Sequence, residues 1–260
     1  MPVQSSHKQG ATHKGYHWVY RSPAENMVCF DYQASRGREG PVAFLNHFKG
    51  ALQTDGYTAY DSFAGHKDIT LLACMAHARR YFEQALDNDE PRATHVLQLI
   101  QGLYAIERQA KTESLSAEER HNLRQEKAVP LLEELHQWLK DNLGEVLPKS
   151  AIGKAIAYSL KLWPRLTRYT ENGQWAIDNN GVENSIRPVA LGRKNYLFAG
   201  SHQAAQQAAM MYSFLGTCKM NRIEPFGWLR EVLRKIPDTR LSELHRLLPI
   251  KDNLKKTNPQ

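Results

Sequence analysis

The chain has 260 residues, of which 42% are hydrophobic and 23% charged, a composition that is typical of globular proteins and excludes a mainly disordered chain. No apolar run reaches the roughly 18 residues that a membrane span needs, and the first ten residues hold no hydrophobic signal core. The three cysteines are odd in number and far apart, so we expect a cytoplasmic protein without a disulfide framework or a membrane partner.

The net charge of +7 is distributed unevenly along the chain. Residues 1–182 hold 21 basic and 21 acidic side chains, whereas residues 183–260 hold 13 basic and 6 acidic ones. The whole excess therefore lies in the last third, which indicates a surface for a polyanion, most often a nucleic acid. A well-solvated basic surface is the alternative.

The first 75 residues have the pattern of a mixed α/β fold. Residues 16–20 (YHWVY) and 27–32 (MVCFDY) are rich in aromatic and β-branched residues, and the turn-like RSPAEN between them predicts a β-hairpin. Pro41 suits the first turn of a short helix that we expect to run through Phe48. Residues 51–54 form a strand candidate, and the apolar run of residues 69–74 predicts a strand covered on both faces.

From about residue 76 to residue 170 the apolar residues recur with helical spacing. Three amphipathic stripes indicate helices of a subdomain inserted into the α/β part, and Ser116 with Glu119 predicts a capping box. The stripes consist of Val96, Leu99, Leu103 and Ile106, then Val129, Leu132, His136 and Leu139, then Ile152, Ile156, Leu160 and Trp163.

Two further helices are expected towards the C-terminus. One is expected to present a single apolar face, and the other is amphipathic. Their apolar residues are Ala204, Ala208, Met211, Leu215 and Cys218 in the first, and Phe226, Leu229, Leu233 and Ile236 in the second.

Asp55 is the first candidate for chemistry. It directly follows a short apolar strand and precedes a glycine, at a point where the chain leaves a sheet. Open sheets place their sites at the carboxyl ends of strands. A turn aspartate is the alternative, because Asp-Gly is a common turn pair.

The second candidate is the segment Asp178–Lys194. A helix that begins near Asn180 puts Glu183 in its first turn and Arg187 one turn later on the same face, and Pro188 is expected to end or bend it. The segment is either an ordinary ion pair or a metal-binding carboxylate flanked by the phosphate-binding residues Arg187, Arg193 and Lys194.

The third candidate is Cys74-Met-Ala-His77-Ala-Arg79-Arg80. A single Cys-x-x-His is at most half of a zinc site, and no second pair is present in the sequence, so a structural, partly buried role is favoured. Arg79 and Arg80 are either solvated or phosphate contacts. The sequence contains no glycine-rich phosphate loop.

Three segments carry a family resemblance: LQTDGYTAY, CMAHARRYF and DNNGVENSIRPVALGRKNYLFAGS. In this order, and together with HKGYHWVY, FDYQASR and KMNRIEPFGWLREVL, they resemble transposases of the insertion sequence 66 family over nearly the whole chain. The resemblance implies a DDE transposase of α/β class, with an RNase H-like core, a large α-helical insertion and a helical C-terminal tail. The implied parts are residues 1–82 (first part of the core), 83–172 (insertion), 173–220 (second part of the core with the catalytic glutamate helix) and 221–260 (C-terminal helical element).

The resemblance also implies the site. In such folds two aspartates from the sheet and a glutamate from a helix bind two divalent metal ions. Asp55 matches the second catalytic aspartate and Glu183 the catalytic glutamate, so both are implied as catalytic and metal-binding residues for Mg²⁺ or Mn²⁺. A Cys-x-x-His after the second aspartate recurs in several DDE groups, which implies that His77 lies close to the site.

The family's first aspartate precedes a segment similar to MPVQ, with which this sequence begins. We therefore expect the C-terminal portion of a transposase that lacks this aspartate, binds metal weakly and is inactive alone.

The implied function is DNA cleavage and strand transfer by two-metal phosphoryl transfer, performed by a homo-oligomer on transposon ends and target DNA. Arg79, Arg80, Arg187, Arg193 and Lys194 are the expected DNA contacts. The alternative is a non-catalytic DNA-binding or dimerising transposase remnant, and an RNase H-like nuclease or resolvase is a third possibility.

Overall fold

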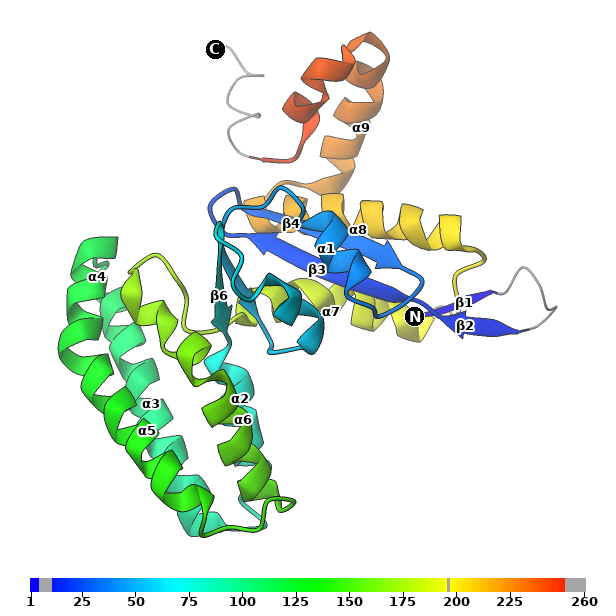
Figure 1. Cartoon of the computed structure of the whole chain (residues 1–260). Helices are drawn as coiled ribbons and strands as arrows, with labels where there is room; N and C mark the ends of the chain where they lie inside the picture. The colour runs from blue at the N-terminus through cyan, green and yellow to red at the C-terminus, as the bar shows by residue number, and fades with distance from the viewer. Residues whose placement is uncertain (5–10, 196, 251–260) are drawn as a thin grey trace. The chain divides into compact units, whose positions relative to one another are not determined.

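The computed structural model describes residues 1–4, 11–195 and 197–250, apart from the side chain of Arg193. Over these residues the fold is mixed α/β, and the strands form three two-stranded sheets (Figure 1). The chain divides into two compact units: the terminal unit, Met1–Asn46 with Gly181–Gln260, and the middle unit, His47–Asn180. None of the described helices is long and apolar enough to cross a membrane.

The terminal unit begins with two antiparallel strand pairs. Strand β1 (Pro2–Gln4) pairs with β2 (Thr12–Lys14), and β3 (Tyr16–Ser22) pairs with β4 (Met27–Gln33). The second pair confirms the predicted hairpin. Asn26 closes its turn with a φ of 49°, a left-handed conformation that asparagine tolerates better than most residues.

Helix α8 (His202–Asn221) lies along β4, as Figure 1 shows. Phe30 N donates to Ser213 Oγ (2.8 Å), Val28 N donates to Thr217 Oγ1 (3.2 Å), and Asn221 Nδ2 donates to the Asn26 carbonyl (2.9 Å). Four residues of a helix rise about 6 Å, and two residues of a strand rise about 6.8 Å. Every fourth residue of α8 can therefore contact every second residue of β4. The helix thereby satisfies backbone groups at the edge of the hairpin.

The buried face of α8 differs from the predicted one. Ala205 and Ala209 are buried against the hairpin, whereas Met211 and Leu215 are about 40% exposed. The prediction was wrong for these two residues because the hydroxyls of Ser213 and Thr217, and not the largest apolar side chains, select the face that meets β4.

Two further helices of the terminal unit also depart from expectation. Helix α1 (Glu39–Phe44) contains Pro41 in its first turn, as predicted, but it ends at Phe44 and not at Phe48. In α9 (Pro225–Lys235) Phe226 and Leu233 of the predicted stripe are 72% and 63% exposed. Trp228 is the buried anchor instead, because its ring packs on Phe214 and its Nε1 donates to the Leu247 carbonyl (2.9 Å). Two 3₁₀ turns follow α9, Ile236–Asp238 and Leu241–Leu247.

The middle unit contains a parallel strand pair, β5 (Gly50–Thr54) and β6 (Ile69–Ala73). A 3₁₀ turn at Thr58–Phe63 lies in the connection between them. Both strands were predicted, and four of the five residues of β6 are buried, as its continuous apolar run indicated.

Helices make up the rest of the middle unit (Figure 1). They are α2 (Met75–Glu83), α3 (Glu90–Thr112), α4 (Ala117–Leu123), α5 (Val129–Leu143) and α6 (Ala151–Leu166), with a π turn at Arg124–Ala128 and a 3₁₀ turn at Arg168–Glu171. Both hydrogen bonds of the predicted capping box are present at Ser116 and Glu119. Most residues of the predicted stripes enter one apolar core with strand β6, but Val129 and His136 of the second stripe do not. In α3, Ile100 is buried more deeply than the predicted Leu99.

The RNase H-like core stays a prediction, as does the division of the chain at residues 82, 172 and 220. The compact units group β5 and β6 with the helices that follow them.

Candidate active site

Asp55 lies at the carboxyl end of the parallel strand pair. Because Thr54 and Ala73 are partners in the register, Asp55 and Cys74 leave the two strands at the same edge. Asp55 is half-buried, its Oδ1 accepts a hydrogen bond from Tyr57 N (3.0 Å), and its carbonyl accepts one from the Tyr158 hydroxyl (2.8 Å). One hydrogen bond thus holds the carboxylate of Asp55, and the other holds its backbone carbonyl.

Gly56 is required by this turn. Its φ is +83°, and a Cβ at this position would lie 2.6 Å from Leu162 Cδ1 and 3.0 Å from the Tyr158 hydroxyl. Both the backbone conformation and the close approach of α6 exclude a side chain here. The Asp-Gly pair is therefore a turn pair, and it also presents a carboxylate at a sheet edge.

Two phenols beside Asp55 stay protonated at neutral pH. Burial raises the pKa of Tyr60 well above its usual range, and the charge of Asp55 raises it further. The pKa of Tyr158 is raised in the same way by burial, by Tyr81 and by Asp55. Both groups therefore remain neutral hydrogen-bond donors near the carboxylate.

Cys74 precedes helix α2 and is fully buried. Its Sγ accepts a hydrogen bond from Asn179 N (3.4 Å), and burial raises the pKa of its thiol. This arrangement agrees with the structural role favoured for Cys74. His77 is half-buried on α2, while Arg79 and Arg80 are exposed, Arg79 as an ion pair with Glu83 (3.0 Å).

The segment before helix α7 (Asn180–Asn195) is held by the middle unit. Asp178 Oδ2 accepts a hydrogen bond from the Tyr104 hydroxyl (2.8 Å), and Asp178 Oδ1 accepts one from Asn180 N (3.0 Å). Burial and the neighbouring Asp178 raise the pKa of Tyr104 above its ordinary value, so the phenol remains a donor. The start of α7 is therefore set by contacts with α3 and with the end of β6.

Helix α7 carries Glu183, Arg187 and Lys194 on one face, because positions i, i+4 and i+11 lie within about 40° of each other on a helix. Glu183 is half-buried, and Arg187 and Lys194 are exposed. The side chain of Arg193 lies outside the described part of the structure.

Pro188 does not end α7, which continues to Asn195. The missing N–H of a helical proline costs about 3 kcal/mol, and burial of Val189 against the β3–β4 hairpin offsets part of that cost.

The expected catalytic residues Asp55 and Glu183, and the residues expected around them, belong to different compact units. Asp55, His77, Arg79 and Arg80 lie in the middle unit, and Glu183, Arg187 and Lys194 lie in the terminal unit. The structure thus brings Asp55 to the same strand edge as Cys74. The convergence of Asp55 and Glu183 on one pocket stays a prediction.

Two regions of the chain match models of known families. A model described as "Transposase IS66 family" matches residues 1–207, and one described as "IS66 C-terminal element" matches residues 213–250. The chain belongs to the IS66 transposase family.

Curated relatives of this IS66-family chain occur in Sinorhizobium fredii (strain NBRC 101917 / NGR234). "Uncharacterized protein y4jD" is 34% identical over 239 residues, covering 88% of this chain and 46% of the relative. "Uncharacterized protein y4hP" is 36% identical over 237 residues, covering 84% of this chain and 43% of the relative. The IS66-family chain thus spans less than half the length of these relatives. No solved structure matches it.

The donor chemistry of Asp55 and Glu183 fits the metal that the family implies. Carboxylate oxygens are the ligands that Mg²⁺ and Mn²⁺ prefer. Among the described residues, no group of three or more His, Cys, Asp or Glu side chains is placed to hold an ion. Asp55 and Glu183 would together supply two of the three carboxylates that the family's site implies.

Sequence reasoning missed two residues of the IS66-family chain that hold the segment before α7. Tyr104 has the spacing of an ordinary amphipathic-helix residue, and Arg124 is one of many charged residues in a helical region. Neither residue is marked by a local motif, because the groups that they bind in residues 169–178 lie 45 to 74 positions away in the chain.

Proposed function

We propose that this chain is a catalytic portion of a DDE transposase with an RNase H-like core, that it supplies Asp55 and Glu183 to a site for DNA cleavage and joining by phosphoryl transfer, and that it is inactive alone because two carboxylates are too few for a two-metal site. The observation that carries the proposal is the face of α7 on which Glu183, Arg187 and Lys194 lie together. Arg187 lies one turn from Glu183, and Lys194 lies about three turns further along the same face. A carboxylate with an exposed cation one turn away suits a metal ion that must meet a DNA phosphate.

The position of Asp55 supports the same assignment. It is a half-buried carboxylate at the carboxyl end of two parallel strands, anchored through Tyr57 and Tyr158. Asp55 and Glu183 would hold divalent ions through their oxygens. When bound, such ions activate the attacking hydroxyl and stabilise the leaving oxygen.

DNA is the proposed partner. Arg187 would neutralise a backbone phosphate next to Glu183, and Lys194 would do so further along the same helix face. Arg79 and Arg80 are exposed on α2, which follows the strand edge that carries Asp55, and could do the same there. Arg193 is included among the proposed DNA contacts because of its position in the family motif. Assembly of a homo-oligomer on DNA stays a prediction.

The test is Mn²⁺ binding by the whole chain, measured by electron paramagnetic resonance or calorimetry. Asp55→Asn and Glu183→Gln should each weaken binding by about tenfold or more, because affinity at such sites depends on the number of charged oxygen ligands. Asp141→Asn, at an exposed aspartate of α5, is the matched control and should bind as the parent chain does.

Two results would contradict the proposal. The first is Mn²⁺ binding that neither Asp55→Asn nor Glu183→Gln weakens. The second is binding that depends on one of these residues only, since the two carboxylates are proposed to share one site. If the chain retains DNA binding in either case, it acts as a non-catalytic DNA-binding remnant.

A further inference from the structure

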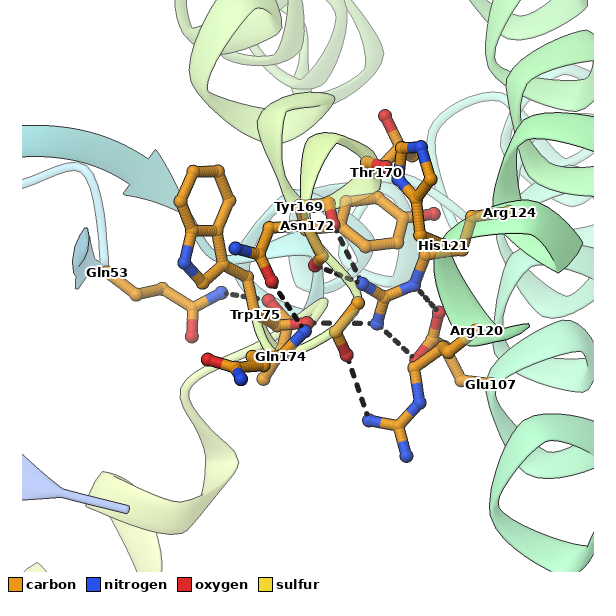
Figure 2. Close-up of polar contacts among 12 residues, drawn as sticks. Gln53, Glu107, Arg120, His121, Arg124, Tyr169, Thr170, Asn172, Gln174 and Trp175 are labelled. Atoms are coloured by element: carbon orange, nitrogen blue, oxygen red, sulfur yellow. Dashed lines mark hydrogen bonds and ion pairs between the residues drawn. The ribbon is translucent and has the colours of Figure 1, made fainter. Parts of the chain in front are cut away.

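Arg124 uses every donor of its guanidinium group although it is fully buried, as Figure 2 shows. Nε and Nη2 donate to the two carboxylate oxygens of Glu107 (2.8 and 2.7 Å). Nη1 donates to the carbonyls of Tyr169 (2.7 Å) and Asn172 (2.8 Å), and Nη2 donates to that of Trp175 (2.9 Å). A guanidinium has five N–H groups, and all five are bonded.

The residues around Arg124 contact the same loop. Gln125 Nε2 donates to the Thr170 carbonyl (2.9 Å), His121 Nδ1 lies 3.0 Å from that carbonyl, and Arg120 Nη1 donates to the Gly173 carbonyl (3.3 Å). The side chains at the junction of α4 and the π turn thus bind the backbone of residues 169–175.

The same chain segment is tied again where it passes the strand edge. Gln53 Nε2 donates to the Ala176 carbonyl (2.7 Å), and Met75 N donates to the Ile177 carbonyl (3.1 Å). Asn179 N donates to Cys74 Sγ, and Tyr104 donates to Asp178. Residues 169–179 are therefore anchored along their whole length, and the next residue begins α7.

Global stability alone does not account for this arrangement. Burying a charged pair costs desolvation free energy, and apolar substitutes of similar volume are often as stable. A buried arginine that binds three carbonyls of one loop instead selects one backbone conformation for that loop. The ordered loop ends at the first residue of the helix that carries Glu183.

We propose that Arg124 and Tyr104, both in the helical part of the middle unit, are positioning residues for the proposed catalytic site: they fix the chain that leads into α7 and so set where Glu183 is presented. Neither residue touches DNA or metal in this role. The inference rests on the proposed function, because it assigns the helical insertion a part in building that site.

The test compares Arg124→Lys and Tyr104→Phe with Arg108→Lys in the whole chain. Lysine keeps the charge at position 124 but has too few donors for Glu107 and three carbonyls. Phenylalanine removes only the oxygen that contacts Asp178. Arg108 is exposed on α3 next to Glu107, which makes it the matched control.

Amide hydrogen exchange and Mn²⁺ affinity are measured on each variant. In Arg124→Lys and Tyr104→Phe, amides of residues 170–180 should exchange about tenfold faster while the buried amides of α3 and α5 keep their protection. The Mn²⁺ dissociation constant should rise by about threefold to tenfold. Arg108→Lys should change neither quantity.

The possible outcomes are distinct. Unchanged exchange at residues 170–180 overturns the proposal, and so does faster exchange with unchanged Mn²⁺ affinity in a chain whose binding requires Asp55. If neither Asp55→Asn nor Glu183→Gln lowers the Mn²⁺ affinity, the proposed function is refuted, and the positioning role with it. If Arg124→Lys does not fold, Tyr104→Phe decides the matter, because the loss of one oxygen leaves the core intact.

Discussion

His17 is a half-buried titratable group of the terminal unit. It lies on β3, where its ring meets the edges of Tyr32 and Tyr212. Burial lowers its pKa from 6.5 to about 4, with the positive amino terminus as a second cause. The folded state therefore holds the neutral ring, and the unfolded state takes up the proton more readily.

This residue should make the stability of the terminal unit depend on pH. Its contribution is complete above the unfolded pKa of 6.5 and is lost as the pH falls towards about 4. We expect the urea midpoint to fall over this interval, and to fall less in His17→Gln. His47→Gln, at an exposed histidine, should behave as the parent chain does. Identical pH profiles for all three chains would contradict this expectation.

Among the elements, α8 shows how a helix can complete a sheet edge. Thr217 Oγ1 accepts a hydrogen bond from Val28 N and donates one to the Val28 carbonyl (3.3 Å). Thr217 is almost fully buried, so water cannot replace it. Two backbone groups of the hairpin depend on this one hydroxyl.

Thr217→Val should therefore destabilise the chain although valine has nearly the same shape. The change leaves the N–H and the carbonyl of Val28 buried without their partner, and such a loss costs about 1–3 kcal/mol. Urea unfolding measures this difference. Gln206→Ala, on the exposed side of α8, serves as the comparison and should cost less than about 0.5 kcal/mol. An equal effect of the two substitutions would show that the hydroxyl does not support the strand.

For the whole molecule, the uneven charge should govern binding to DNA. The excess of basic residues lies at positions 183–260, which include Arg187 and Lys194. Each phosphate that a cation neutralises releases counterions, so affinity falls steeply with rising salt.

We expect Arg187→Ala and Lys194→Ala each to reduce the slope of log affinity against log salt by about 1, measured by fluorescence anisotropy with a labelled duplex. Lys161→Ala, at an exposed lysine of α6, should leave the slope unchanged. Equal slopes for all the variants would place the DNA contacts elsewhere.

Much of the local structure follows from patterns within a few residues. The aromatic and β-branched segments with the turn-like RSPAEN between them, the apolar run of β6 and the capping box at Ser116 are short-range signals, and each element is present in the structure. The faces of α8 and α9 were misjudged, because Ser213, Thr217 and Trp228 choose their side through partners on other elements. A helical-wheel projection of the apolar residues does not show these partners, because they lie on other elements.

Sequence was thus sufficient for the family and for most of the helices and strands, since these depend on residue identity and spacing. The roles of Asp55 and Glu183 stay predictions. Sequence was not sufficient for the role of Arg124, because nothing in the sequence distinguishes it from an exposed charged residue. Only the structure shows it bound to Glu107 and to carbonyls of residues 169–175. Desolvation and hydrogen bonding act between atoms that folding brings together. A contact across 45 residues or more therefore leaves no trace in local spacing, and it becomes visible only once the chain has folded.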